Sequence, residues 1–204
     1  SLEAFNGMVS VDGFAVFLDV IFLGSGLAGI ALAYDYPKRT HIERGEYYSL
    51  LLFTVAGMML MTYANDLVIV FLALELLSLP LYVMAGFARL QLLSEEAALK
   101  YFLMGAFSST FVLYGVALIF GATARTDLPG VVAAVQGGTA NPVFFLVGAA
   151  MLLVGFGFKS AVMPFHMWAP DVYQGSPSSV TAFMTVGAKA AGFAALLRVF
   201  VVAF

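Results

Sequence analysis

The hydrophobic positions of the chain form six long runs, separated by short polar or turn-forming segments. The runs cover residues 12–33, 47–63, 67–88, 97–121, 142–163 and 178–204. About 20 apolar residues in a helix cross a hydrocarbon core of about 30 Å. The runs lack the alternation of apolar and polar positions that membrane-barrel strands require. The pattern therefore predicts an all-α, polytopic transmembrane bundle of about six spans, organised as a single module.

The connections between the runs are mostly short. Asn65-Asp66 predicts a tight turn, which would make the second and third spans antiparallel neighbours. Residues 122–141 form a longer connection with a weakly helical middle at 128–136. The sequence Ser94-Glu95-Glu96 is typical of a helix start, with acidic residues in the first turn.

The remaining segments are expected to be irregular. The expected irregular segments are the lead at 1–11 and the polar loops at 34–46, 89–96 and 165–177.

The fifth span carries a charge and then a helix breaker. Lys159 lies inside the apolar run, and Pro164 follows it by five residues. A proline that interrupts a membrane helix frees backbone groups, which must then be buried in protein or face water. We therefore expect a broken helix near residues 163–165, with a polar site beside it.

Composition supports the membrane class and excludes several kinds of function. The chain is 62% hydrophobic and 10% charged, whereas soluble domains carry roughly 25% charged residues. It has no cysteine, which excludes disulfides, thiolate metal sites and iron–sulfur clusters. The net charge of −3 and the absence of a basic cluster give no reason to expect a nucleic-acid partner. No G-x-G-x-x-G nucleotide motif occurs on a strand–helix unit, and we expect no cofactor or metal on this chain.

Basic residues in the loops predict the orientation. Lys38, Arg39, Arg44 and Arg89 lie in loops that should share one side, and Arg125 lies on the other. By the positive-inside rule, the segments 34–47, 89–96 and 165–177 are cytoplasmic and the N-terminus is outside.

Three ionisable residues are predicted to lie deepest in the membrane: Glu75, Lys159 and Lys189. Each would cost roughly 2.5–3.5 kcal/mol facing lipid, so they should face one another or water. The three side chains together predict a Glu–Lys ion pair with a second lysine close by. The glutamate favours the charged lysine, whereas burial and the other lysine disfavour it. Such a group suits the uptake and release of protons.

A purely structural interpretation remains open for each of these residues. Glu75 could serve as an interhelical hydrogen-bonding group, Lys189 could bind a backbone carbonyl among its small neighbours, and Lys159 could snorkel toward the break. His166 follows directly after the break. Its unperturbed pKa of about 6.5 suits proton transfer, although a structural hydrogen bond explains it equally well.

Six other polar or aromatic residues receive structural interpretations first. We expect a polar interhelical contact for Asp19, snorkelling for Arg198, and interfacial positions for Trp168 and Tyr173. Asp171 should cap the turn or orient neighbouring groups, and Lys100 has either snorkelling or function as its role.

Several long motifs resemble one family. The segments 74–87 (which begins Leu-Glu-Leu-Leu-Ser-Leu-Pro-Leu-Tyr), 96–109 and 157–177 are similar to the antiporter-like subunits of respiratory complex I. The form of the first motif and the Asp-Val-Tyr-Gln-Gly-Ser-Pro ending favour the subunit N branch of NADH–quinone oxidoreductase over its sisters L and M. The resemblance runs through nearly all of the 204 residues.

The resemblance implies a fold and a set of roles. Family members have about fourteen helices in two inverted five-helix repeats, each with a broken helix. This chain would be a part of such a subunit, with the first repeat at about 47–204. By motif position, Glu75 and Lys159 resemble the family's glutamate–lysine pair. Lys189 resembles the lysine that passes protons onward, and His166 resembles the histidine of the cytoplasmic entry path.

The resemblance thus implies a proton-translocating membrane subunit of NADH:quinone oxidoreductase, a translocase component with no redox chemistry of its own. Its partners would be the other membrane subunits of complex I and the lipid of a bacterial plasma membrane. A subunit of a multi-subunit Na⁺/H⁺ antiporter is the alternative hypothesis, because such subunits share the buried Glu–Lys arrangement. A membrane subunit without transport, whose buried charges only fix helix packing, is the third hypothesis.

Overall fold

A computed structural model describes residues 2–39 and 45–203, and it is almost entirely helical. The elements are β1 (Leu2–Ala4), β2 (Val9–Val11), α1 (Gly13–Arg39), α2 (Glu46–Tyr63), α3 (Leu67–Ala85), α4 (Leu92–Thr123), α5 (Leu128–Gln136), α6 (Pro142–Ser160), α7 (Ala169–Gly175), α8 (Ser178–Phe183), η1 (Met184–Ala188), α9 (Lys189–Leu197) and η2 (Arg198–Ala203). The last four follow one another directly, with π-helical turns at η1 and η2.

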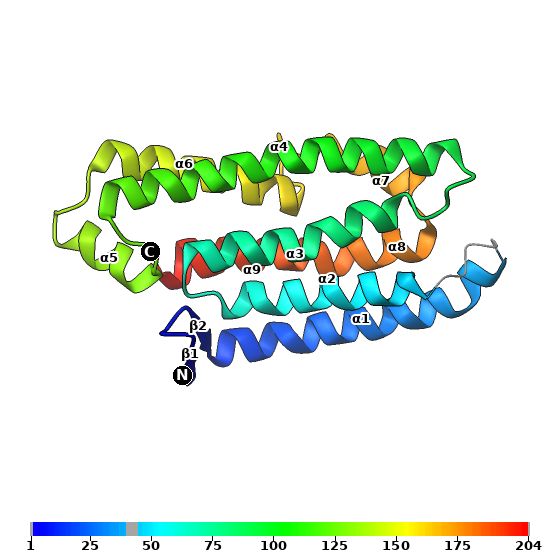
Figure 1. Ribbon diagram of the computed structural model, residues 1–204, viewed down its shortest axis with the longest axis horizontal. Helices are drawn as coiled ribbons and strands as arrows, with labels where there is room; N and C mark the ends of the chain where they lie inside the picture. Colours follow the sequence, from blue (N-terminus) through cyan, green and yellow to red (C-terminus); the bar gives the residue numbers. More distant parts are fainter. Residues whose placement is uncertain (1, 40–44, 204) are drawn as a thin grey trace.

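The long helices run side by side (Figure 1). α4 packs against α6 and α3, α2 packs between α3 and α1, and α9 contacts both α6 and α2. The predicted antiparallel pairing of the second and third spans is confirmed, because the turn at Asn65-Asp66 joins α2 directly to α3. The β1–β2 hairpin and η2 lie at the same end of the bundle, together with α5 (Figure 1).

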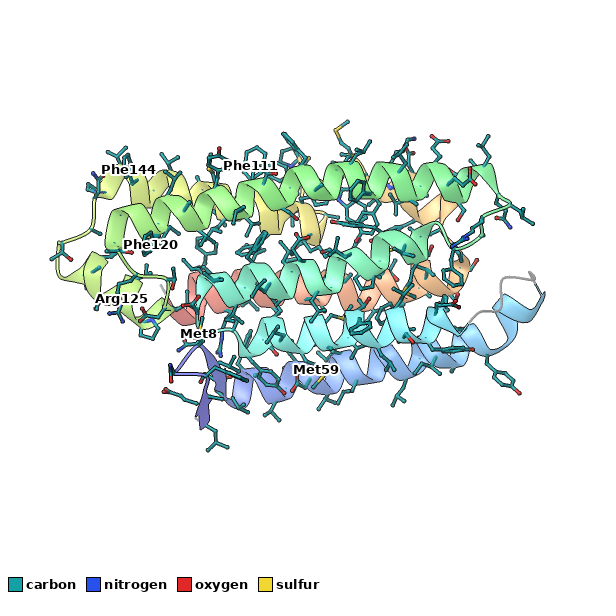
Figure 2. The ribbon with its side chains drawn as sticks, in the orientation of Figure 1. Met8, Met59, Phe111, Phe120, Arg125 and Phe144 are labelled. Carbon is teal, nitrogen blue, oxygen red and sulfur yellow. The ribbon has the colours of Figure 1, made fainter. Side chains whose placement is uncertain are left out.

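The polytopic helical class is confirmed. In the part of the chain that the structure describes, five stretches are long and apolar enough to cross a membrane: Gly13–Tyr34, Leu67–Ala85, Leu92–Thr123, Pro142–Ser160 and Ser178–Val201. α2 does not reach that hydropathy, although it lies between α1 and α3 where the second span was expected. Side chains project outward from α4 and α6, Phe111 and Phe144 among them (Figure 2). Such a surface suits lipid or neighbouring helices.

The segments predicted as irregular contain more structure than expected. α1 continues through part of the predicted loop to Arg39, while positions 40–44 lie outside the described residues. The lead forms an antiparallel hairpin of β1 and β2, and the 165–177 segment contains α7. The first turn of α4 begins at Leu92, before the expected start. Ser94 instead donates a hydrogen bond to the Ala85 carbonyl at the end of α3, at 2.8 Å.

Arg198 does not snorkel; it is 3% exposed and joins the two ends of the chain. Its guanidinium forms an ion pair with Asp12 and donates to the backbone carbonyls of Ala64 (3.1 Å) and Ser10 (3.2 Å). Planar guanidinium groups suit such multiple contacts. The side chain therefore fastens the N-terminal hairpin to the last helix and to the turn between α2 and α3.

Glycines allow neighbouring helices to approach closely. A Cβ atom at Gly57 of α2 would lie 2.5 Å from the backbone nitrogen of Leu77 in α3, which leaves no room for a side chain. Close contact of this kind substitutes for the hydrophobic effect in driving helix association within lipid. The position of α3, which carries Glu75, thus depends on Gly57.

We expect Gly57→Ala to lower the stability of the protein by about 1–3 kcal/mol, because the new methyl group must push α2 and α3 apart. Gly24→Ala in α1 is the matched control, since a Cβ there would meet nothing within 4 Å. The measurement is the thermal-unfolding midpoint of each variant in detergent. Equal midpoints for the two variants would contradict the close approach of the helices.

Candidate functional site: a buried lysine at a broken helix

The end of α6 lies inside the bundle instead of at its rim. α6 has 19 residues and α4 has 32, and α6 stops partway along α4 (Figure 1). Lys159 is the second-last residue of α6, so its side chain starts deep in the molecule. The predicted break near 163–165 is confirmed. It begins earlier, at Ala161, whose φ of 55° ends the helix in a left-handed conformation.

Two carbonyl groups at the broken end of α6, those of Gly157 and Phe158, are hydrogen-bonded within the chain. Val162 N–H donates to Gly157 O at 2.9 Å, and Ala161 N–H donates to Phe158 O at 3.0 Å. The indole Nε1–H of Trp168 also donates to Phe158 O, at 3.1 Å. The negative end of the α6 dipole thus lies in the interior, beside the Lys159 ammonium, where it favours a cation.

Lys159 is 4% exposed, so it does not snorkel out of the bundle. Its Nζ donates to Ser78 Oγ at 2.8 Å and to Tyr101 OH at 3.3 Å, and it lies 5.6 Å from the centre of the Tyr101 ring. α3, α4 and α6 thus each supply one group. An ammonium taken out of water needs such partners, since an unpaired buried charge is very costly.

Glu75 lies one helical turn before Ser78 on α3 and is half-buried. It accepts a hydrogen bond from Ser109 Oγ of α4 and acts electrostatically on Lys159. The expected direct ion pair is not formed: within the described residues, Lys159 is held by hydroxyl groups and the carboxylate lies beyond them. Ser78, which also donates to the Leu74 carbonyl, stands nearest to the ammonium.

An aromatic cluster surrounds the break. Trp168 stacks on Tyr101 with ring centres 4.8 Å apart, stacks on Phe158 at 5.3 Å, and meets the edge of Tyr173 at 5.8 Å. The expectation of an interfacial Trp168 was wrong, because the ring is 3% exposed. The indole N–H binds the Phe158 carbonyl at the broken end of the helix, and that bond accounts for its burial.

The aromatic cluster reaches the second lysine. Lys189 Nζ lies 5.2 Å from the centre of the Tyr173 ring, in a cation–π arrangement. Among residues 2–39 and 45–203, no hydrogen bond or ion pair of Lys189 is present, so the alternative interpretation, a bond to a backbone carbonyl, is not seen. Lys189 directly follows the π-helical turn η1, and such turns often accompany functional sites.

His166 is not brought into contact with Lys159. It lies exposed in the turn between α6 and α7. Asp171 does not cap a turn but pairs with Lys100 at 2.7 Å, and Glu96 approaches the same ammonium at 2.6 Å. This exposed cluster ties α7 to α4. A pocket of about 180 Å³ lies between these two helices.

Asp19 forms the interhelical contact that the sequence predicts. It is 8% exposed and accepts hydrogen bonds from Tyr63 and Thr62 of α2. Its place between α1 and α2 separates it from the lysine site. In the described portion of the chain, no group of three or more His, Asp or Glu residues is arranged to hold a metal ion.

Sequence reasoning missed the three hydroxyl groups of the site: Ser78, Tyr101 and Ser109. Ser78 lies three residues after Glu75, on the same helix face. That three-residue spacing could have predicted Ser78 as a part of the site. Tyr101 and Ser109 come from another helix, and only the packing of α4 against α3 and α6 brings them to the site.

The fold and the site define a helical, multi-pass membrane protein that encloses a hydrogen-bonded lysine with a carboxylate nearby. The chain belongs to the family described as NADH:quinone oxidoreductase/Mrp antiporter, transmembrane, whose model matches residues 64–204. The resemblance drawn from the motifs is thereby confirmed.

Similar proteins support the same family. NADH-quinone oxidoreductase subunit N of Chloroflexus aggregans is 51% identical over 95% of this chain and 40% of its own length. The subunit N of Trichlorobacter lovleyi is 48% identical over 100% and 42%. A chain of respiratory complex I from Thermus thermophilus superimposes with a TM-score of 0.81, at 41% identity over 96% of this chain and 42% of that one. This chain therefore spans about two fifths of the length of its relatives.

We expect Ser78→Ala to lower the stability of the protein by about 1–3 kcal/mol, because it removes an acceptor from a buried ammonium. Thr110→Ala on the exposed face of α4 is the matched control, since it also removes a hydroxyl that binds a carbonyl one turn back. Thermal unfolding in detergent measures both. Ser78 does not hold Lys159 if the two variants unfold at the same temperature.

Proposed function

We propose that this chain is part of a proton-translocating membrane subunit of an NADH:quinone oxidoreductase in a bacterial plasma membrane. The proposal rests on the buried Lys159, held by hydroxyl groups from two other helices, in a chain whose relatives are named subunit N. A buried ionisable group of this kind in a membrane protein is typical of a proton path. The translocase role, coupled to quinone reduction, is part of this proposal. We assign the redox chemistry and its cofactors to other subunits.

The proposed path runs from the α7 end of the bundle toward Lys189. A proton enters near His166, which is exposed beside the break. It binds the neutral Lys159 amine, and the ammonium is then stabilised by Ser78, Tyr101 and the nearby Glu75 charge. A change in a neighbouring membrane subunit alters the distance to Glu75, and Lys159 then releases its proton toward Lys189.

The loops support a proposed orientation in the membrane. The connection between α3 and α4 and the region of α7 lie at the end opposite to the chain termini (Figure 1). We propose that this end, with the segments 89–96 and 165–177, is cytoplasmic. From its basic residues in the sequence we assign the segment 34–47 to the same side, although positions 40–44 lie outside the described residues. The other end, with the β1–β2 hairpin, would face outward. The remaining membrane subunits of complex I are the proposed partners.

The family description includes Mrp antiporters, so a Na⁺/H⁺ antiporter subunit is the second candidate. The names of the similar proteins favour the first candidate, since subunit N relatives match nearly the whole chain at 48–51% identity.

Replacing the carboxylate tests the proposal most directly. In inverted membrane vesicles that carry the complete complex, we expect Glu75→Gln to reduce proton pumping and NADH oxidation together, by about 10-fold or more, because a group that tunes proton transfer is lost. The complex should still assemble. If pumping and oxidation stay unchanged, Glu75 has a structural role and the proposed site is wrong.

A second pair of variants separates transport from packing. We expect Lys159→Ala to abolish pumping in an assembled complex, because no group then takes up the proton. Lys159→Arg keeps the charge but cannot release a proton, since arginine stays protonated in proteins, so it should also fail to pump. Recovery of full turnover by Lys159→Arg, measured in the same vesicles, would instead show that only the buried charge matters for packing.

A further inference from the structure

Three buried hydroxyl groups near the broken helix have no hydrogen-bond partner within the described part of the chain. They belong to Ser160 at the end of α6, and to Tyr173 and Ser176 at the end of α7. Buried polar groups in native proteins are nearly always hydrogen-bonded, to protein or to internal water. Three exceptions within one region therefore require an explanation.

Internal water explains them better than another protein segment does. Each of the three oxygens is enclosed by atoms of this chain, and Ser160 and Ser176 are only 4% and 7% exposed. A side chain from a neighbouring subunit therefore has no route to them. A water molecule binds in such polar interior sites with two to four hydrogen bonds.

The Ser160 hydroxyl lies between the two lysines of the proposed path. Ser160 follows Lys159 directly, and a Cβ atom at Gly192 of α9 would lie 2.6 Å from Ser160 Oγ. Gly192 comes three residues after Lys189, so the two occupy neighbouring positions on one helix face. The hydroxyl thus lies against the turn of α9 that begins with Lys189.

Tyr173 approaches the same turn from α7. Its ring lies under the Lys189 ammonium, at 5.2 Å. It also makes a T-shaped contact with Trp168, which stacks on Tyr101, the residue that holds Lys159. Tyr173 is therefore placed between the two lysines, with its polar end free to bind water.

We infer that the Tyr173 hydroxyl, with internal water that it and Ser160 bind, is the relay that carries protons from Lys159 to Lys189. This inference rests on the proposed function. It assigns a water-binding site and a relay residue to the segment between the broken helix and α9.

The transfer is balanced at each atom. The Lys159 ammonium gives one proton to a water molecule, and Lys159 becomes a neutral amine. The water passes a proton to the Tyr173 oxygen as the Tyr173 O–H proton moves to a second water molecule, which in turn gives a proton to the neutral Lys189 amine. Lys189 then carries the charge, and Tyr173 and both water molecules regain their starting forms. Tyrosine can act in this way because its hydroxyl both donates and accepts.

The test is Tyr173→Phe in inverted vesicles that carry the complete complex, because phenylalanine keeps the ring under Lys189 and removes only the oxygen. We expect pumping and coupled NADH oxidation to fall roughly 10-fold, with a larger solvent deuterium isotope effect, because proton transfer becomes the slow step. Ser160→Ala should cause a smaller loss in the same direction. Tyr114→Phe is the matched control, since that ring is 60% exposed on α4, and it should behave as the wild type.

Two results would overturn the relay but leave the proposed function intact. In the first, Tyr173→Phe pumps protons as fast as Tyr114→Phe does. In the second, Tyr173→Phe pumps more slowly but its solvent isotope effect is unchanged, which indicates only disturbed packing. If the complex with Tyr173→Phe does not assemble, the Ser160→Ala variant tests the relay instead. Proton pumping at the wild-type rate by Ser160→Ala would reject the relay. Wild-type pumping by Lys159→Ala would reject the proposed function, and the relay with it.

Discussion

Removing the Lys159 ammonium from water is the constraint on which the arrangement of this bundle depends. A charge of this kind costs several kcal/mol in an apolar interior unless polar groups replace its hydration. The chain supplies them from three helices: the broken end of α6, Ser78 on α3 and Tyr101 on α4. Each must approach within hydrogen-bonding distance, so the spacing of these helices is fixed by the site as well as by apolar packing.

The broken helix meets the same constraint from the backbone side. A continuous α6 would carry its carbonyl end to the rim of the bundle, far from the lysine. Ending at Ser160 places that end inside, where the freed carbonyls must be bonded. Trp168 supplies one of those bonds and packs against the ring of Tyr101. The indole therefore stabilises the break and also positions a partner of Lys159.

The sequence predicts the helices well, because uninterrupted apolar runs leave few alternatives in a membrane. It predicts the buried charges for the same reason: Glu75 and Lys159 are conspicuous in apolar surroundings. It does not predict which groups meet them, because serine and tyrosine are ordinary residues in membrane helices and carry no signal of their own. The same limit explains Arg198, whose partner Asp12 lies at the other end of the chain. From the sequence alone, a basic residue near a helix end is interpreted as snorkelling, because the β1–β2 hairpin that covers Arg198 cannot be predicted.

The hydroxyl partners explain how a buried lysine can change its charge. A carboxylate in direct contact would stabilise only the ammonium, and deprotonation would then leave a buried carboxylate without its partner. A hydroxyl oxygen accepts from the ammonium and can equally accept from the neutral amine, which keeps two N–H groups, so Ser78 and Tyr101 can bond to Lys159 in either form. Glu75 lies one turn before Ser78 on α3, and its charge acts on Lys159 without direct contact. A small movement of α3 or α4 therefore alters this electrostatic interaction without breaking the hydrogen bonds of Lys159. Because Glu75 and Lys159 are not in direct contact, the charge state of Lys159 can respond to movements of the neighbouring helices.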